Sequence, residues 1–235
     1  MIYLRETFDA GVSRTHRDEL YEIYRQEVLP AASRLHVKLW GSWFIALGTG
    51  NWNQMFNIWA FPDWAAWGEF VHKQLNEMQY SDLERRMLKY RRVATTELMM
   101  PQPYWKEGEL IVGGTHGTGM LYVWESINAE PERWAEYMKG LKEEAIPSSG
   151  PRLNWIGSWQ TAPGGGRNYQ IFNVWSVADW NTWAGNSTVP AEAGNTENER
   201  QQNRAIQRNW AAKAMEYRRE MSHHLMVPTP LSPFK

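Results

Sequence analysis

The sequence predicts an α+β fold in which two similar halves each form an antiparallel sheet covered by helices. Three observations predict it. A segment from Gly41 to Trp67 recurs without a gap from Gly157 to Trp183, with 13 identical residues in 27 positions. Apolar residues alternate along some segments and recur at helical spacing in others, in the same order in both halves. Glycines at 48, 50 and 164–166 stand where tight connections between strands require positive φ.

The first half reads as β-α-β-β-α-β. A strand over Ile2–Phe8 is followed by a helix from about Thr15, whose apolar residues share one face. Two strands, about Lys38–Ala46 and Asn53–Phe61, form the hairpin. Asp63 is a natural N-cap for the second helix, because its carboxylate can accept from free backbone N–H groups. A strand at about 93–100 completes the half.

The second half repeats this order. Pro131 suits the start of its first helix, where a missing N–H does no harm, and Asp179 matches Asp63. After Trp183 the offset grows from 116 to 127, since Tyr90-Arg91-Arg92 matches Tyr217-Arg218-Arg219. The sequence therefore predicts a first repeat at 1–106, a linker at 107–118, and a second repeat at 119–235 with an insertion at about 185–202.

This element order predicts a four-stranded antiparallel sheet with both helices on one face. The other face of each sheet would be open. Two such sheets packed face to face would cover each other, so the sequence predicts a cavity between them.

Several segments resemble the NIPSNAP family. They are Met1-Ile2-Tyr3, Thr7-Phe8, Leu39-Trp40-Gly41-Ser42-Trp43 and Ile58-Trp59-Ala60-Phe61. The resemblance covers both halves and implies the dimeric α+β barrel (ferredoxin-like) superfamily, with two tandem repeats in one chain. The chain departs from the family pattern at Glu6, where the family commonly has Arg.

The superfamily implies several activities, and fold alone does not choose among them. They are cofactor-free oxygenation of phenolic or quinone-like substrates, cyclisation or dehydration of polyketide-like molecules, lactone isomerisation and haem chemistry. Some members have no known activity.

Composition narrows the partners. A net charge of −1 gives no basic field for nucleic acid, and no Cys is present for thiolate sites. No apolar run approaches roughly 18 residues, so we expect a cytoplasmic protein without a signal peptide or membrane partner. The 15 Trp residues would fill a core, and some of them would line a cavity for a small hydrophobic or aromatic molecule. Assembly into a homo-oligomer is left open.

Strand 53–61 supplies the first site candidates. Phe56 and Ile58 suit packing against helices, so we expect the alternate residues to face the cavity. Those are Met55, Asn57 and Trp59, with Asn173 and Trp175 in the second half. An amide can donate to a developing oxyanion and an indole can sandwich a ring. The competing interpretation is that each Asn only satisfies backbone groups.

Strand 2–8 and the last strand supply the others. Tyr3 and Arg5 share a face, and Tyr122 and Trp124 stand at the matching positions. Glu6 lies on the opposite face, where we expect it to reach solvent. Adjacent His223 and His224 point to opposite faces, so they cannot chelate together.

The sequence therefore predicts an enzyme acting on a small hydrophobic or aromatic molecule by cofactor-independent oxygenation, cyclisation or isomerisation. The expected catalytic residues are Asn57, Asn173, Arg5 and His224. The expected substrate-binding residues are Trp59, Trp175, Met55, Tyr3, Trp124 and Tyr122. No metal and no cofactor are predicted. The alternatives are a non-catalytic NIPSNAP-like binding or scaffold protein and a haem-binding barrel enzyme.

Overall fold

The computed structural model describes residues 1–11, 13–46, 48–49, 53–103, 120–148, 154–184 and 197–234. The predicted linker at 107–118 and most of the predicted insertion at 185–202 lie outside these residues. The chain divides into two compact units, which are described separately below. The first contains Met1–Pro101, Ala162–Gly166 and Met226–Phe234, and nearly all the remaining residues form the second.

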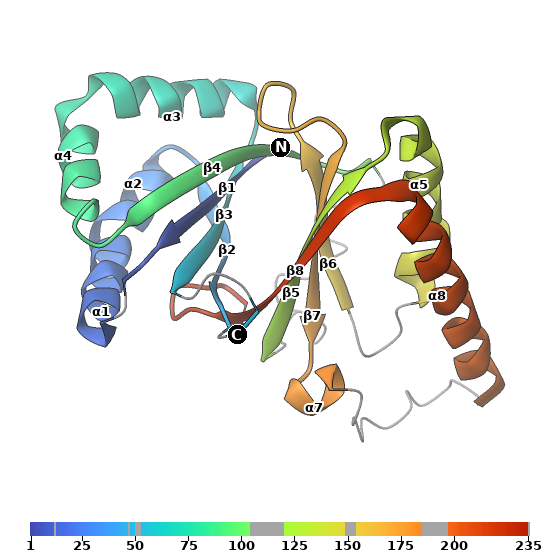
Figure 1. The fold of residues 1–235 in the computed structure, drawn as a ribbon. Helices are drawn as coiled ribbons and strands as arrows, with labels where there is room; N and C mark the ends of the chain where they lie inside the picture. Colours follow the sequence, from blue (N-terminus) through green and yellow to red (C-terminus); the bar gives the residue numbers. More distant parts are fainter. Residues whose placement is uncertain are drawn as a thin grey trace. The chain divides into compact units, whose positions relative to one another are not determined.

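The first unit has the predicted element order, shown in Figure 1. Its elements are β1 (Ile2–Asp9), α1 (Arg14–Ile23), the π-helical segment η1 (Tyr24–Val28), α2 (Leu29–Arg34), β2 (Lys38–Ile45), β3 (Gln54–Phe61), α3 (Trp64–Asn76), α4 (Met78–Met87) and β4 (Arg92–Pro101). The strands pair in the order β4-β1-β3-β2, all antiparallel, and the helices lie on one side of this sheet.

The second unit follows the same order. Its elements are β5 (Leu121–Ala129), η2 (Pro131–Arg133), α5 (Trp134–Gly140), η3 (Leu141–Ala145), α6 (Ile146–Ser148), β6 (Asn154–Thr161), β7 (Gln170–Val177), α7 (Trp180–Trp183), α8 (Glu197–Tyr217) and β8 (Arg218–Pro228). Strand order is β8-β5-β7-β6.

Two further pairings complete the first unit. The last residues of β8, Met226–Pro228, pair with Trp43–Ile45 of β2, and the Ala162 N–H donates to the Leu98 carbonyl at 2.9 Å. The hydrogen-bonded order of the strands, β1-β3-β2-β8-β5-β7-β6-β4, returns to its start, which is the topology of a closed antiparallel barrel. The predicted mixed α/β class with eight antiparallel strands is confirmed, while its origin in two ferredoxin-like repeats stays a prediction.

The repeated Gly-Ser-Trp sequence has a packing cause. The ring of Trp43 lies across Gly41, so that a Cβ at Gly41 would meet the ring at 1.9 Å. Trp159 lies across Gly157 in the same way, at 2.2 Å. Both rings are fully buried. Only glycine leaves room for them, so this motif carries structure rather than chemistry.

The helix boundaries agree with the predicted caps, with one difference. Asp63 accepts a hydrogen bond from the Ala66 N–H at 2.9 Å, and Asp179 accepts one from the Thr182 N–H at 2.7 Å. The predicted single second helix of the first half is instead two helices, because Glu77 adopts an extended conformation between α3 and α4. No residue of α3 is fully buried. Among the described residues, no helix has the length and apolar character needed to cross a bilayer.

The predicted faces of strand 53–61 are wrong. Met55, Trp59 and Phe61 pack in one core cluster with the α1 residues Leu20 and Tyr21, so they face the helices. The opposite face carries Phe56 and Ile58, and both faces of this strand are buried. Alternation of apolar and polar residues distinguishes faces only where one of them meets water, so it gave no signal here.

Candidate functional site

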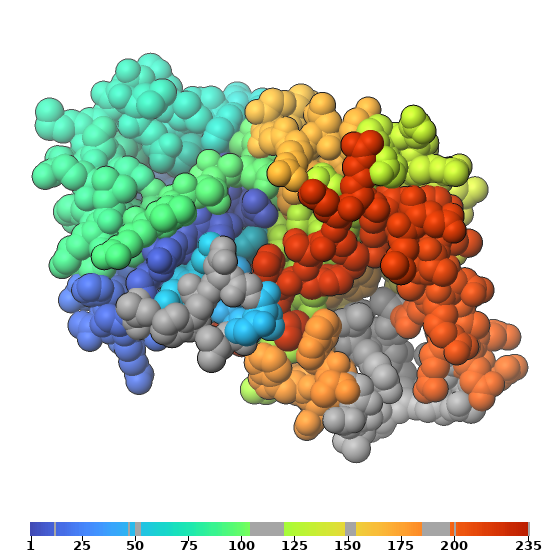
Figure 2. Space-filling view, in the orientation of Figure 1, coloured from blue at the N-terminus to red at the C-terminus, as the bar shows by residue number. Residues whose placement is uncertain are grey.

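A cavity of about 260 Å³ lies within the first unit, between the helix-facing side of its sheet and the helices. This volume is slightly below the roughly 300–1,000 Å³ of typical ligand pockets, so a ligand would be small. Helices α3 and α4 form the outer surface of this part of the unit (Figure 2). The lining is mainly apolar: Leu4, Val28, Ala31, Ala32, Leu35, Val37, Trp59, Phe61, Trp67, Phe70, Tyr80, Leu83 and Met87. The polar lining residues are Glu6, Tyr24, Gln74, Glu84, Arg91 and Thr96.

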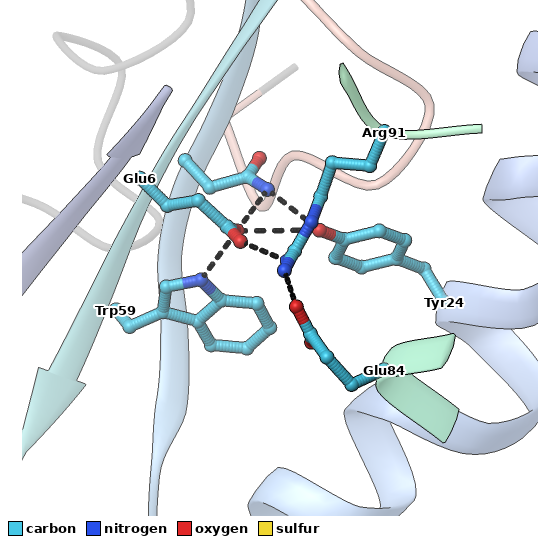
Figure 3. Close-up of polar contacts among 6 residues, drawn as sticks. Glu6, Tyr24, Trp59, Glu84 and Arg91 are labelled. Carbon is cyan, nitrogen blue, oxygen red and sulfur yellow. Dashed lines mark hydrogen bonds and ion pairs between the residues drawn. The ribbon is translucent and has the colours of Figure 1, made fainter. Parts of the chain in front are cut away.

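Glu6 is the centre of a polar cluster at this cavity (Figure 3). Its Oε2 accepts from the Tyr24 hydroxyl at 3.2 Å, from Asn57 Nδ2 at 3.1 Å and from Trp59 Nε1 at 3.2 Å. Glu6 is only 6 % exposed, which corrects the expectation that it reaches solvent. β1 places Glu6 directly opposite Asn57 of β3, and a buried carboxylate requires this number of donors to replace water.

Arg91 ties the cluster to α4. Its Nη1 pairs with Oε1 of Glu6 and its Nη2 pairs with Oε1 of Glu84. Burial lowers the pKa of Arg91, but the charges of Glu6, Tyr24 and Glu84 outweigh it, and the pKa lies above its usual value. The guanidinium therefore stays charged. Its Nε is buried and has no partner among the described residues.

Tyr24 is a neutral hydrogen-bond donor in this cluster. Burial, followed by the charge of Glu6, raises the pKa of its phenol well above 10.0. The ring stacks on Trp59 with centroids 6.2 Å apart. Tyr24 opens the π-helical segment, and Pro30 follows shortly after it. Because proline lacks an N–H and displaces the carbonyl of the preceding turn, the π segment has a structural cause.

Asn57 holds Glu6 in place and does not line the cavity. It is fully buried, and its Nδ2 lies 3.2 Å from the Tyr24 hydroxyl as well as near Glu6. The amide orientation follows from the carboxylate, which needs the donor side toward it. The predicted catalytic Asn57 is therefore a positioning residue at this site.

The second unit contains a related but different cluster. Glu125 Oε2 accepts from Asn173 Nδ2 at 2.7 Å, and Asn173 Oδ1 accepts from the Ser158 hydroxyl at 2.7 Å. His223 Nε2 lies 3.2 Å from Glu125 Oε1. Burial raises the pKa of Glu125, but the hydrogen bond from His223, the charge of Arg218 and the hydrogen bond from Asn173 outweigh it, so the pKa lies below its usual value.

A tryptophan fills the helix–sheet interior of the second unit. Trp210 of α8 packs against Tyr137 with centroids 5.4 Å apart, and a Cβ on Gly140 would meet its ring at 2.1 Å. At the offset of 127, the matching residue of the first unit is Leu83, which lines the cavity. A smaller side chain at this position leaves the space open.

The other predicted site residues are not gathered at the cavity. Tyr3 and Arg5 lie on the opposite face of β1 from Glu6, and Arg5 pairs with Glu97 at 2.6 Å. Trp124 stacks on Phe172 with centroids 5.1 Å apart. Three more belong to the second unit. Tyr122 is fully buried in β5, and Trp175 is buried in β7 opposite Val123. His224 points to the opposite face of β8 from His223, which contacts Glu125.

Of the predicted residues, only Trp59 lines the cavity of the first unit; Met55 packs in the adjoining core. The sequence reasoning missed Glu6, Tyr24, Glu84 and Arg91. One signal was available, since Glu6 matches Glu125 in the second half and departs from the family pattern.

Within the described residues, no three His, Asp or Glu side chains are placed to hold a metal ion. Haem binding through histidine also finds no support at this cavity, because none of the described residues lining it is a histidine.

Comparison with known proteins gives the fold. No protein-family model and no curated protein match the sequence. A candidate monooxygenase from Lactobacillus acidophilus is similar in structure, with 10 % identity, 96 % of this chain and 93 % of that chain covered, and a TM-score of 0.58. An anthrone oxidase-like protein has 9 % identity, covers 100 % of this chain and 94 % of its own, and has a TM-score of 0.52.

NIPSNAP proteins are also among the similar structures, as the sequence resemblance predicted. A NIPSNAP domain protein from Burkholderia xenovorans has 18 % identity and covers 46 % of this chain and 100 % of its own, with a TM-score of 0.38. The likeness to the candidate monooxygenase and to the anthrone oxidase-like protein shows the α+β barrel fold and says nothing about chemistry.

Proposed function

We propose that this chain binds a small hydrophobic or aromatic molecule in the cavity of the first unit and acts on it by proton transfer, with Glu6 as the proton acceptor. The observation that carries the proposal is a mainly apolar cavity that ends in a buried carboxylate held by three donors and one guanidinium. Apolar pockets with a few convergent polar groups are the usual form of small-molecule sites.

The proposed step balances charge. A C–H or O–H proton of the molecule passes to the Glu6 carboxylate, and the bonding electron pair stays on the molecule. The cavity then holds a neutral Glu6 and a substrate that is more negative by one charge, so negative charge moves without being created. Arg91, which pairs with Glu6, keeps a positive charge next to the site of proton transfer in both states. Cyclisation, isomerisation and cofactor-independent oxygenation can all begin with this step.

One further prediction from the sequence stays a proposal. We propose that the chain arose by tandem duplication of one α+β repeat, since the two units share element order and the 13 identities. We also propose that the described part of the second unit has less space at the matching position, since Trp210 stands where the first unit has Leu83.

A hydrogen-exchange experiment tests the proposal. Phenylacetone, a neutral aromatic ketone with acidic C–H bonds, is incubated with the protein in D₂O, and deuterium uptake at its α-carbons is followed by NMR. We expect exchange above the buffer rate, loss of this excess in Glu6→Gln, and loss in Leu83→Trp, which closes the cavity as Trp210 does. Exchange that survives Leu83→Trp would contradict the proposed site.

Binding without exchange separates the two candidate functions. In one outcome, phenylacetone quenches Trp fluorescence saturably in the wild type and not in Leu83→Trp. If the wild type then shows no deuterium uptake, the catalytic step is contradicted and a binding protein is left. An oxygen electrode on the same samples shows whether proton transfer is followed by oxygenation.

A further inference from the structure

We infer that the cavity of the first unit selects a small arylalkylamine, bound as its ammonium cation, over an arylalkyl carboxylate of similar size. The inference rests on the proposed binding site and names the charge class of its ligand. The observations behind it are the charged side chains and the aromatic rings that line the cavity. The inference does not depend on which reaction follows binding.

The described lining carries more negative than positive charge. Glu6 and Glu84 are carboxylates and Arg91 is the one cation, and no other described lining residue is charged. The formal balance is therefore −1. A cationic ligand brings this balance to zero, whereas an anionic ligand doubles the excess. Glu6 and Arg91 are largely buried, while the Glu84 side chain is 43 % exposed, so salt screens these charges only in part.

Arg91 is already engaged by two protein carboxylates. Its terminal nitrogens pair with Glu6 on one side and with Glu84 on the other. An end-on bidentate contact from a ligand carboxylate would compete with both of these pairs. The two protein carboxylates would also repel a ligand carboxylate that approached the guanidinium from any side.

The walls suit an organic cation. Trp59 stacks on Tyr24, and Phe61 makes edge contacts with Trp67 and Phe70 at centroid distances of 5.2 and 5.3 Å. All five rings line the cavity. Aromatic faces attract ammonium groups through their quadrupole, more strongly once the cation is desolvated. A site lined by both carboxylates and aromatic rings suits an arylalkylammonium ligand.

Three probes of similar size test the inference: 2-phenylethylamine, 2-phenylethanol and phenylacetate. Their dissociation constants are measured by calorimetry at neutral pH and low salt. We expect the amine to bind most tightly and the carboxylate most weakly, with a ratio of about tenfold or more between them. Raising the salt concentration should reduce this ratio, because screening weakens charge contacts.

Three variants locate the effect. Glu84→Gln changes the balance of the lining from −1 to 0, so the preference for the amine over the carboxylate should fall several-fold. Glu69→Gln, an exposed change on α3 that does not line the cavity, should leave all three constants unchanged. Leu83→Trp should abolish binding of all three probes.

The outcomes distinguish the inference from the proposed function. Suppose that the alcohol or the carboxylate binds as tightly as the amine, and that Leu83→Trp abolishes this binding. The inference about ligand charge is then overturned, and the proposed binding site stands. If no probe binds, or binding survives Leu83→Trp, both are overturned. An unchanged preference in Glu84→Gln would also overturn the inference.

Discussion

Replacing Glu6 with Gln should destabilise the protein far more than its single-atom change suggests. The glutamine oxygen can still accept from Tyr24, Asn57 and Trp59. Its amide nitrogen, however, would face the guanidinium of Arg91, so a buried ion pair becomes a contact between two donors. The loss of the pair leaves Arg91 buried with one carboxylate in place of two.

The size of the effect follows from that geometry. Removing one partner of a buried ion pair typically costs about 3–5 kcal/mol, because the other charge stays uncompensated. Glu84 still pairs with Arg91, and its side chain is 43 % exposed, so part of the charge stays compensated. We therefore expect a loss of about 2–4 kcal/mol, a large share of the roughly 5–15 kcal/mol stability of a typical domain.

Urea unfolding measures this loss through Trp fluorescence and far-UV circular dichroism, with the transition midpoint and slope compared between variants. Glu69→Gln is the matched control: it removes an exposed pair with Lys73, so its transition midpoint should stay close to that of the wild type. Adding Arg91→Gln to Glu6→Gln should cost less than the two single changes together, since they share one contact. A Glu6→Gln midpoint indistinguishable from that of Glu69→Gln would refute the argument that this carboxylate holds the cluster together.

Three other predictions concern packing and pH. Gly41→Ala should lower stability by about 2–3 kcal/mol, because its Cβ would strike the buried Trp43 ring. Gly68→Ala on α3 should raise stability by about 0.5–1 kcal/mol, because a Cβ there meets no atom within 4 Å. Equal urea midpoints of the two variants would contradict both predictions. The pKa of Glu125 lies below its usual 4.5, so the carboxylate stabilises the fold above that pH, and this contribution is lost as pH falls through the folded-state pKa. The difference in unfolding free energy between wild type and Glu125→Gln should therefore shrink from about pH 6 to about pH 3. A constant difference would oppose this. Burial raises the pKa of Tyr21 to about 12, so spectrophotometric titration should lose a late component in Tyr21→Phe, and an unchanged curve would count against it.

The fold was predictable because its determinants are local. Gly-Ser-Trp, the Asp63 and Asp179 caps and the alternating strands each specify backbone geometry within a few residues. Strand order followed from element order. The break between α3 and α4 was not predictable, because the apolar spacing continues through Glu77 while the backbone there turns extended.

The site was less predictable, for a physical reason. The sequence identified Asn57 and Trp59 but assigned them to the wrong side of the sheet, because both faces of β3 are buried and its pattern has no polar side. Glu6 was placed in solvent because an isolated carboxylate is rarely buried. Its partners Tyr24 and Arg91 are 18 and 85 positions away in the chain, and only the packed structure brings them to Glu6.

The two units show why chemistry should be sought in one of them. Each contains a buried Glu–Asn pair on neighbouring strands, so the pair alone cannot mark a site. The helices that follow differ: α4 presents Leu83, which lines the cavity beside Glu6, whereas α8 presents Trp210, which packs against Tyr137 and lies across Gly140. The lowered pKa of Glu125 indicates that its carboxylate stabilises the second unit. We therefore propose that function in this chain depends on the helix side chains packed over the sheet as well as on the Glu–Asn pair. The change Trp210→Leu tests whether the second unit can be opened.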